Sequence, residues 1–338
     1  MRPGGATRRF GAGALAVVAL GLIGLGVSSC GRRDEAVSPD AGTVSFAILS
    51  AQGQASAAPL WQPLLDDMSR SIGVRVTAHF ANDYGALVDD LARGTAQAAW
   101  LSAQPAIDAV DRADAEVVAR TVNLDGQDSY HAVLIVKRGS GLTLDGVLAC
   151  DRTLDYGVGD ARSTSATLAP QAFLFSPRRL QPETCFRAVR SDNHERHARE
   201  VASGILDVAA TNTPTLAALA QQNPSIAAEV EEIWRSPALP EGGIVLREDM
   251  DPALKEKIRG FFLSYGRGND VVAERQRRVL AGLHYSRFIA ADADYLDPVR
   301  EILADEALNR ARASGDRKAA AAAEQNLAAL RAKREVQP

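Results

Sequence analysis

The chain has 338 residues, of which 46% are hydrophobic and 24% charged, values typical of a globular protein with room for two domains. Its 38 lysines and arginines stand against 42 acidic residues, a formal net charge of −4. This acidic balance argues against a nucleic-acid partner, because a phosphate backbone requires a basic protein face.

The N-terminus differs from the rest of the chain in composition. Arg2, Arg8 and Arg9 precede the apolar stretch GAGALAVVALGLIGLGV, which ends at VSSC, residues 27–30. A basic region, an apolar region and a small-residue cleavage site indicate a secretory signal peptide, which we predict over residues 1–29. The alternative is a transmembrane anchor, but about 17 apolar residues diluted by glycine lie at the short end of the roughly 20 that a bilayer span needs.

The VSSC motif resembles a bacterial lipobox, in which Cys30 becomes the lipidated first residue of the mature protein. The alternative is a chance cysteine behind an ordinary signal peptide. Residues 30–42 are polar and contain Pro and Gly, which predicts a flexible tether. We therefore predict a periplasmic or cell-surface lipoprotein that is anchored to the membrane through Cys30. Cleavage would remove three arginines and no acid, leaving a formal charge of about −7.

Two cysteines remain after cleavage, Cys150 and Cys185. In an oxidising compartment a disulfide between them is expected, and two free buried thiols are the alternative. Each cysteine lies at or just before the start of a predicted strand, and a parallel sheet would place two such starts at the same end.

Strands and helices alternate along the first half of the mature chain. Apolar residues alternate in TVSFAILS as in a strand, whereas PLWQPLLDDMSRSIG has its leucines, Met68 and Ile72 at helical spacing. The same criteria predict strands at 43–50, 74–80, 97–102, 116–123 and 129–139, and helices at 59–73, 82–94 and 104–114. Strands that alternate with helices of 10 to 15 residues predict an α/β fold with a mainly parallel sheet.

The second half repeats this alternation in a smaller unit. Strands are expected at 154–159, 185–190 and 206–211, and helices from about 167, at 194–204 and at 251–266. We predict two lobes, the first formed by 43–136 and 240–300 and the second by 137–239. The remainder is expected to be helical after about Arg287, and residues 301–338 to form a charged helical tail that is solvated or docks elsewhere.

Three hydroxyl side chains, Ser163, Thr164 and Ser165, lie between a predicted strand and a predicted helix. Pro170 belongs in a first helical turn, where no donor is needed, so the helix should begin near 165–167. Unpaired N–H groups and the helix dipole at this end favour an anion, and hydroxyls beyond the one that caps the helix can donate to it. The alternative is a Ser/Thr-rich cap. A nucleophilic serine is not supported, since ARSTSAT lacks the G-x-S-x-G pattern.

Several segments together resemble the phosphate/phosphite/phosphonate family of ABC-transporter solute-binding proteins. They are NDYGALVDDLARG, LDGQDSYHAVLIVKRGSGL, STSATLAP, SDNHERHAREVASGILDVAATNT, WRSPALP and ADYLDPVR. The resemblance implies a two-lobed periplasmic binding protein fold, type II-like, with the ligand in a cleft between the lobes. It also implies that the phosphorus oxyanion is held by Ser163, Thr164, Ser165, Tyr84, Tyr130 and His194. The family usually has glycine after the hydroxyls, where this chain has Ala166.

Each of the last three residues has a structural alternative. Tyr84 and Tyr130 can be half-buried core aromatics with their hydroxyls in water. His194 can be a first-turn residue beside a capping pair formed by Asp192 and Glu195. The remaining histidines are His79, His131, His197 and His284. They show no metal-ligand spacing, so no metal or cofactor is expected. No carboxylate pair suggests acid/base chemistry.

Two positions depart from the family pattern. Members that bind an amine-bearing phosphonate generally carry an acid where this chain has Pro214, and another where it has Gly242. Glu241 is one residue away and would substitute only if the loop shifts. We therefore expect ligands without an amine to be preferred.

We conclude from the sequence that the protein is a monomeric solute-binding component of an ABC importer, with a permease and an ATPase as partners, and not an enzyme. The main alternative is a sensory binding protein that signals ligand occupancy to a membrane partner, an alternative that the long charged tail keeps open. A phosphonate-ester hydrolase is a third and weaker possibility.

Overall fold

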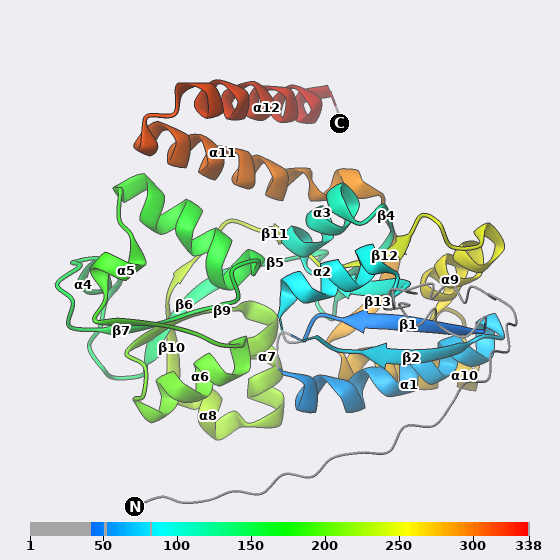
Figure 1. Cartoon of the computed structure of the whole chain (residues 1–338). Coiled ribbons are helices and arrows are strands. Elements are labelled where there is room, and N and C mark those ends of the chain that lie inside the picture. The colour runs from blue at the N-terminus through cyan, green and yellow to red at the C-terminus, as the bar shows by residue number, and fades with distance from the viewer. Residues whose placement is uncertain (1–41, 51–52, 82, 337–338) are drawn as a thin grey trace, which may run out of the picture. The chain divides into compact units, whose positions relative to one another are not determined.

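The computed structural model describes residues 42–50, 53–81 and 83–336. The predicted signal peptide, the lipidation site Cys30 and almost all of the predicted tether lie outside these residues. Within them, no helix combines the length and the apolar content that a membrane span requires. Strands and helices alternate and form two sheets and a short two-stranded ribbon (Figure 1).

The first sheet has six strands in the order β13–β4–β12–β3–β1–β2. Its strands are β1 (Thr43–Ile48), β2 (Arg75–His79), β3 (Ala98–Leu101), β4 (Ala115–Asn123), β12 (Gly243–Arg247) and β13 (Tyr285–Ala290). Strands β1, β2 and β3 are parallel, whereas β12 pairs antiparallel with β3 and β4, and β13 antiparallel with β4. The prediction of a mainly parallel sheet is wrong here, because β12 and β13, which enter this sheet after the chain returns from the second lobe, run opposite to the other four strands.

Alternation along β1 sends side chains to opposite faces of this sheet. Phe46 and Ile48 join a core covered by α1 (Gln54–Ile72), α9 (Pro252–Ser264) and α10 (Val271–Gly282). Ala47 joins the opposite core, under α2 (Tyr84–Arg93) and α3 (Ala103–Arg112). Helix α1 begins five residues before the predicted start, because the Ala-rich segment QASAA favours continuing the helix.

The second sheet has five strands in the order β10–β6–β9–β7–β8. They are β6 (Ala132–Lys137), β7 (Asp155–Val158), β8 (Ala188–Ser191), β9 (Val208–Asn212) and β10 (Val230–Arg235). On one face, Tyr156 of β7 packs with Phe175 of the helical segment after residue 163 and with Phe186, and α4 (Leu144–Val147) and α5 (Pro182–Cys185) complete this core. The other face carries α6 (His194–Ser203), α7 (Thr213–Gln222) and α8 (Pro224–Ala228).

The chain crosses between the sheets twice, after β4 and after β10. At the crossings β5 (Ser129–Tyr130) pairs antiparallel with β11 (Leu239–Pro240). The predicted lobe boundary at 136 falls inside β6, whose partners β9 and β10 both belong to the second sheet. The segment SYHAVLIVK contains no Gly or Pro that would signal a break, so the sequence predicts one strand where β5 and β6 occur, separated at His131. We therefore propose lobes of 43–128 with 241–296 and of 132–236.

The helical segment begins inside the hydroxyl cluster, at Thr164, slightly earlier than predicted. It starts with a π-helical turn η1 (Thr164–Leu168), continues through η2 (Gln171–Phe175), and ends in a 3₁₀ turn η3 (Ser176–Arg178). Pro170 therefore lies beyond the first turn, and the argument that used it to locate the helix start is wrong. The π geometry explains why it is tolerated: the carbonyl of Ala166, four residues before Pro170, accepts the Gly159 N–H at 3.1 Å and lacks no partner.

Of the two alternatives for the C-terminal tail, a solvated helix or a docked one, the structure shows a docked tail. Strand β13 runs past Arg287 to Ala290, and after η4 (Ala293–Leu296) the helices α11 (Asp297–Ser314) and α12 (Arg317–Val336) pack side by side (Figure 1). Helix α11 contacts α3, β11, η1 and η2, and its Val299 is fully buried in the core of the first lobe. The sequence left docking open as an alternative but did not indicate the surface that α11 contacts, because α11 is polar around most of its circumference.

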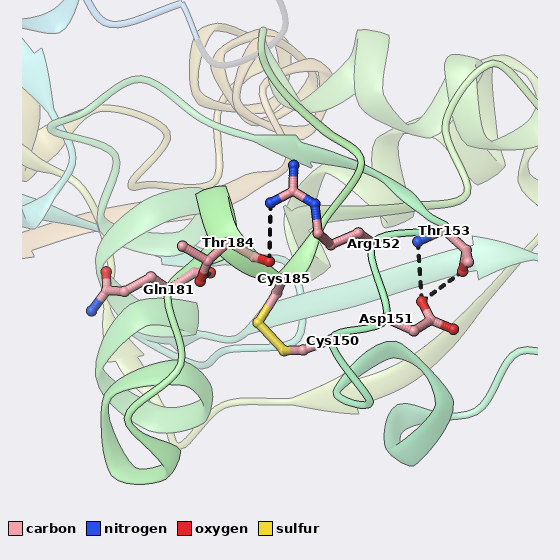
Figure 2. The surroundings of a disulfide bond; sticks show 7 residues. All are labelled: Cys150, Asp151, Arg152, Thr153, Gln181, Thr184 and Cys185. Carbon is pink, nitrogen blue, oxygen red and sulfur yellow. Dashed lines mark hydrogen bonds between the residues drawn. A yellow bond between two sulfur atoms is a disulfide. The ribbon is translucent and has the colours of Figure 1, made fainter.

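A disulfide joins Cys150 and Cys185 in the second lobe (Figure 2), with their Cα atoms 4.0 Å apart. Cys150 precedes β7, whereas Cys185 ends α5 just before β8 rather than opening that strand. Strands β7 and β8 are parallel neighbours, so both cysteines lie at the same end of the sheet.

Replacing both cysteines by serine should lower the free energy of unfolding. The bond closes a loop of 35 residues, and the chain entropy released in the unfolded state corresponds to about 3–4 kcal/mol. Urea denaturation of the double variant measures the loss, and the wild type in reducing agent should show a similar one. Equal stability of oxidised and reduced protein would contradict a structural role for this bond.

Candidate ligand-binding site

Five of the six residues predicted to hold the ligand line one pocket. Tyr84 comes from the first lobe and Tyr130 from the crossing ribbon, whereas Ser163, Ser165 and His194 come from the second lobe. The sixth residue, Thr164, does not line this pocket. The fold thus brings together side chains that are more than 100 residues apart in the sequence.

The three hydroxyls of the turn have different partners. Ser163 is the N-cap, and its Oγ accepts the Ala166 N–H at 3.1 Å. Ser165 Oγ accepts a hydrogen bond from Asn212 Nδ2 at 3.3 Å. Since an accepting hydroxyl keeps its own O–H, both serines can donate to a ligand at the positive end of the helix.

Thr164 makes a contact between the lobes instead. Its Oγ1 accepts the backbone N–H of Gln104 on α3 at 2.9 Å. Two further contacts join the same parts of the molecule: Arg162 pairs with Asp108 at 2.9 Å, and the Tyr84 N–H donates to Asp160 at 3.3 Å. The second lobe therefore touches the first along the rim of the pocket.

The two tyrosines lie at the ends of their elements, Tyr84 at the start of α2 and Tyr130 at the end of β5. Tyr84 is the first residue of α2, whose N-cap Asp83 accepts the Ala86 N–H at 2.7 Å. Tyr130 is 6% exposed and packs with Leu239 of the partner strand. Burial raises the pKa of both phenols, so each remains an O–H donor at neutral pH.

His194 is the first residue of α6 and is 3% exposed. Its helix is capped by Asn193, which accepts the Arg196 N–H at 2.9 Å, so the capping pair considered from the sequence does not form. Burial, with a smaller contribution from His197, lowers the pKa of the imidazole to about 3. A neutral ring carries one N–H donor, and among the described residues its Nδ1 has no hydrogen-bond partner.

Sequence reasoning missed several pocket residues. Asn212 caps α7 through the Thr215 N–H, a role that an Asn before Thr-Pro could have indicated, while its amide also reaches Ser165. Trp61 and Trp100, with ring centroids 5.6 Å apart, also line the pocket, and no local pattern marks them. Glu241, considered only as a substitute acid, lies in the lining as well.

The other histidines do not form a metal centre. His79 pairs with Asp90 at 2.6 Å, while the Nδ1 atoms of His131 and His197 lie 2.8 and 3.0 Å from backbone carbonyls. His284 lines the pocket. Over the described part of the chain, no group of histidine, cysteine and acidic side chains has the arrangement of a metal site.

Burial of neutral His194 should make the protein less stable in acid. The folded pKa lies below the unfolded value of about 6.5, so the unfolded state binds a proton that the folded state lacks. Stability should fall as pH drops from about 6.5 toward 3, by at most about 1.4 kcal/mol per pH unit. Urea denaturation across this range should show a shallower pH dependence for His194→Gln than for the wild type. The same pH dependence of stability in the wild type and in His194→Gln would contradict a neutral, buried His194 in the folded protein.

Comparison with known proteins places the chain in a family. A family model described as the periplasmic substrate-binding protein of a phosphonate ABC transporter matches residues 46–296. The phosphonates-binding periplasmic protein of Escherichia coli is 35% identical over 260 residues, which cover 77% of this chain and 75% of that protein.

Solved structures agree with this match. A binding protein component of an ABC phosphonate transporter from Pseudomonas aeruginosa superposes with a TM-score of 0.82 and 32% identity, covering 88% of this chain and 100% of that one. A Prochlorococcus marinus protein solved with methylphosphonate shares the fold, with a TM-score of 0.68, 18% identity and coverages of 77% and 97%. The predicted two-lobed fold and the predicted family are thereby confirmed. The chain belongs to the family of periplasmic substrate-binding proteins of ABC phosphonate transporters.

Proposed function

We propose that the pocket holds the phosphonate group of the transported ligand with Ser163, Ser165, Tyr84, Tyr130 and His194. The observation that supports this most strongly is their convergence: all five were selected from the sequence, and all five line one pocket. The donors available are two serine hydroxyls at a helix N-terminus, two protonated phenols and one neutral imidazole. Charge-assisted hydrogen bonds contribute about 1.5–3 kcal/mol each, so three or four are sufficient for micromolar binding, about −8 kcal/mol.

Thr164 has a different role in this proposal. Its bond to Gln104, the Arg162–Asp108 pair and the Tyr84–Asp160 bond all cross from one lobe to the other. These contacts favour the closed arrangement, in which both lobes reach the same anion. The β5–β11 ribbon is the candidate hinge, because it is where the chain crosses between the lobes. Ligand binding would then select the closed state by its larger number of contacts.

We further propose that Cys30 carries a lipid anchor and that the protein delivers its ligand as a monomer to the permease and ATPase of the transporter. The order of basic region, apolar region and VSSC supports the anchor. A tether of about a dozen residues would span up to about 40 Å, which leaves the folded part free to reach a membrane partner.

Ser165→Ala and Thr164→Val should weaken binding to different extents. Loss of the Ser165 donor should cost about 1.5–3 kcal/mol of methylphosphonate affinity, and loss of the Thr164 contact between the lobes about 0.5–1.5 kcal/mol. Calorimetric titration measures both, with Ser203→Ala, exposed at the end of α6, as the matched control. A folded Ser165→Ala variant with wild-type affinity would show that Ser165 does not bind the ligand and would leave the hydroxyl turn with a capping role alone.

The lipid anchor has a direct chemical test. Mass spectrometry of the membrane-extracted protein should find a mature chain that begins at an acylated Cys30, and Cys30→Ala should release the protein from the membrane. An unmodified Cys30, or a retained 1–29 segment, would show that the protein is not a lipoprotein.

A further inference from the structure

A buried carboxyl group shares the pocket with the proposed anion-binding residues. Glu241 lies between β11 and β12, is 4% exposed, and lines the same pocket as Ser163 and Ser165. Its Oε1 accepts a hydrogen bond from Asn123 Nδ2 at 2.8 Å, and its Oε2 accepts one from the Gly242 N–H at 3.3 Å. Both oxygens thus have a neutral donor before any ligand enters.

No cation offsets this carboxyl group. In the part of the chain that the structure describes, no lysine or arginine forms an ion pair with Glu241. The titratable groups that surround it are Tyr130 on β5, Tyr285 on β13, Tyr295 on η4 and Asp125 after β4. Neither the phenols nor the Asp125 carboxylate can neutralise a negative charge on Glu241. The charge of Asp125 disfavours the ionised form of Glu241 further.

The nearest candidate cations do not change this balance. Arg120 on β4 pairs with Asp128 at 2.7 Å and lies over the Tyr295 ring. Burial lowers the pKa of His194 and of His284, so neither pocket histidine is charged at neutral pH. Burial raises the pKa of the Glu241 carboxyl to about 7, although the bonds from Asn123 and Gly242 act in the opposite direction.

The wall beside Glu241 is aromatic and apolar. A Cβ atom at Gly242 would lie 2.6 Å from the Trp100 ring, so no acidic side chain fits at 242 while the indole occupies this space. Trp61, Leu60 and Leu283 continue the lining. Pro214, the other position where an acid was sought, also lines the pocket and offers no charge.

From these observations we propose that the pocket takes a phosphonate with an uncharged, apolar substituent, and that Glu241 is protonated in the complex. This inference rests on the proposed function, because it needs the phosphonate group in the same pocket. Two negative charges in a buried pocket repel each other, and Glu241 relieves the repulsion by taking up a proton. A ligand with an ammonium group would instead keep Glu241 ionised and cause proton release.

The sign of the pH dependence follows from this coupling. The free carboxyl group titrates near pH 7, and a bound anion raises its pKa further, so binding above pH 7 takes up a proton. Affinity for the anion should therefore fall as pH rises above 7. Ionisation of Glu241 should lower the affinity for the anion about fivefold between pH 7 and pH 8, and by at most tenfold per pH unit at higher pH.

The test uses n-propylphosphonate and 2-aminoethylphosphonate, which have the same chain length and differ in a methyl or an ammonium end. Titration calorimetry of the wild type and Glu241→Gln, in buffers of different ionisation enthalpy, gives the affinity and the number of protons exchanged. We expect the wild type to prefer propylphosphonate by at least tenfold. On binding propylphosphonate, the wild type should also take up more protons than Glu241→Gln. Protons exchanged by the ligand itself are the same for both proteins, so they cancel when the two proton numbers are subtracted.

The outcomes separate the two proposals. Propylphosphonate binding to both proteins at pH 8, where free Glu241 is mostly ionised, with equal proton exchange would overturn the role of Glu241 and leave the proposed function standing. Tighter binding of 2-aminoethylphosphonate, lost in Glu241→Gln, would show that Glu241 pairs with an ammonium group and would overturn the inference as well. If neither ligand binds the folded wild type, the proposed function fails, and the inference with it.

The proposal can also be tested without a variant, in case Glu241→Gln does not fold. Carbon-13 NMR of glutamate-labelled wild-type protein follows the carboxyl signals against pH with and without propylphosphonate. One buried carboxyl group should titrate near pH 7 in the free protein and at higher pH in the complex. A single unshifted titration would contradict proton uptake by Glu241.

Discussion

Two helix starts, that of η1 in the second lobe and that of α3 in the first, have backbone N–H groups without intrahelical partners, and the hydroxyl turn between the lobes supplies an acceptor to each. Ser163 caps the turn, Ser165 contacts Asn212, and Thr164 accepts the Gln104 N–H from the first lobe. All three hydroxyls are almost fully buried. A single serine would cap the helix, but it could not also position the second lobe and provide a further donor to the pocket. This is why three hydroxyls stand in a row.

The close packing beneath this turn explains neighbouring residues. A Cβ atom at Gly159 would lie 2.6 Å from that of Ala166, so only glycine allows the strand to approach the turn so closely. Gly159 also donates its N–H to the Ala166 carbonyl, the group that Pro170 cannot serve. The departure from the family at Ala166 is therefore accommodated: a methyl group fits there because Gly159 has none. The π-helical start and the proline are parts of one arrangement.

Charge in the pocket is distributed unevenly. The second lobe contributes neutral donors at a positive helix end, whereas the crossing segment contributes the buried carboxyl group of Glu241. Trp100 and Gly242 act as a pair, since the indole lies where a side chain at 242 would be. An anion and an unpaired carboxylate in one buried space cannot both keep full charge at low cost. In the mechanism that we propose, the proton on Glu241 is therefore part of ligand binding.

The alternation of strands and helices and a capping hydroxyl at the turn could be predicted from local sequence, because periodicity and capping chemistry act over a few residues. The family, and with it the six candidate ligand residues of which five line the pocket, came from the resemblance of several motifs in their order along the chain. Tertiary structure alone decided that Thr164 faces the other lobe, that β6 belongs to the second sheet, and that α11 buries Val299. It also decided the position of Glu241 beside Trp100, residues separated by more than a hundred positions. Such contacts arise when distant segments pack, and no pattern within a single segment encodes them.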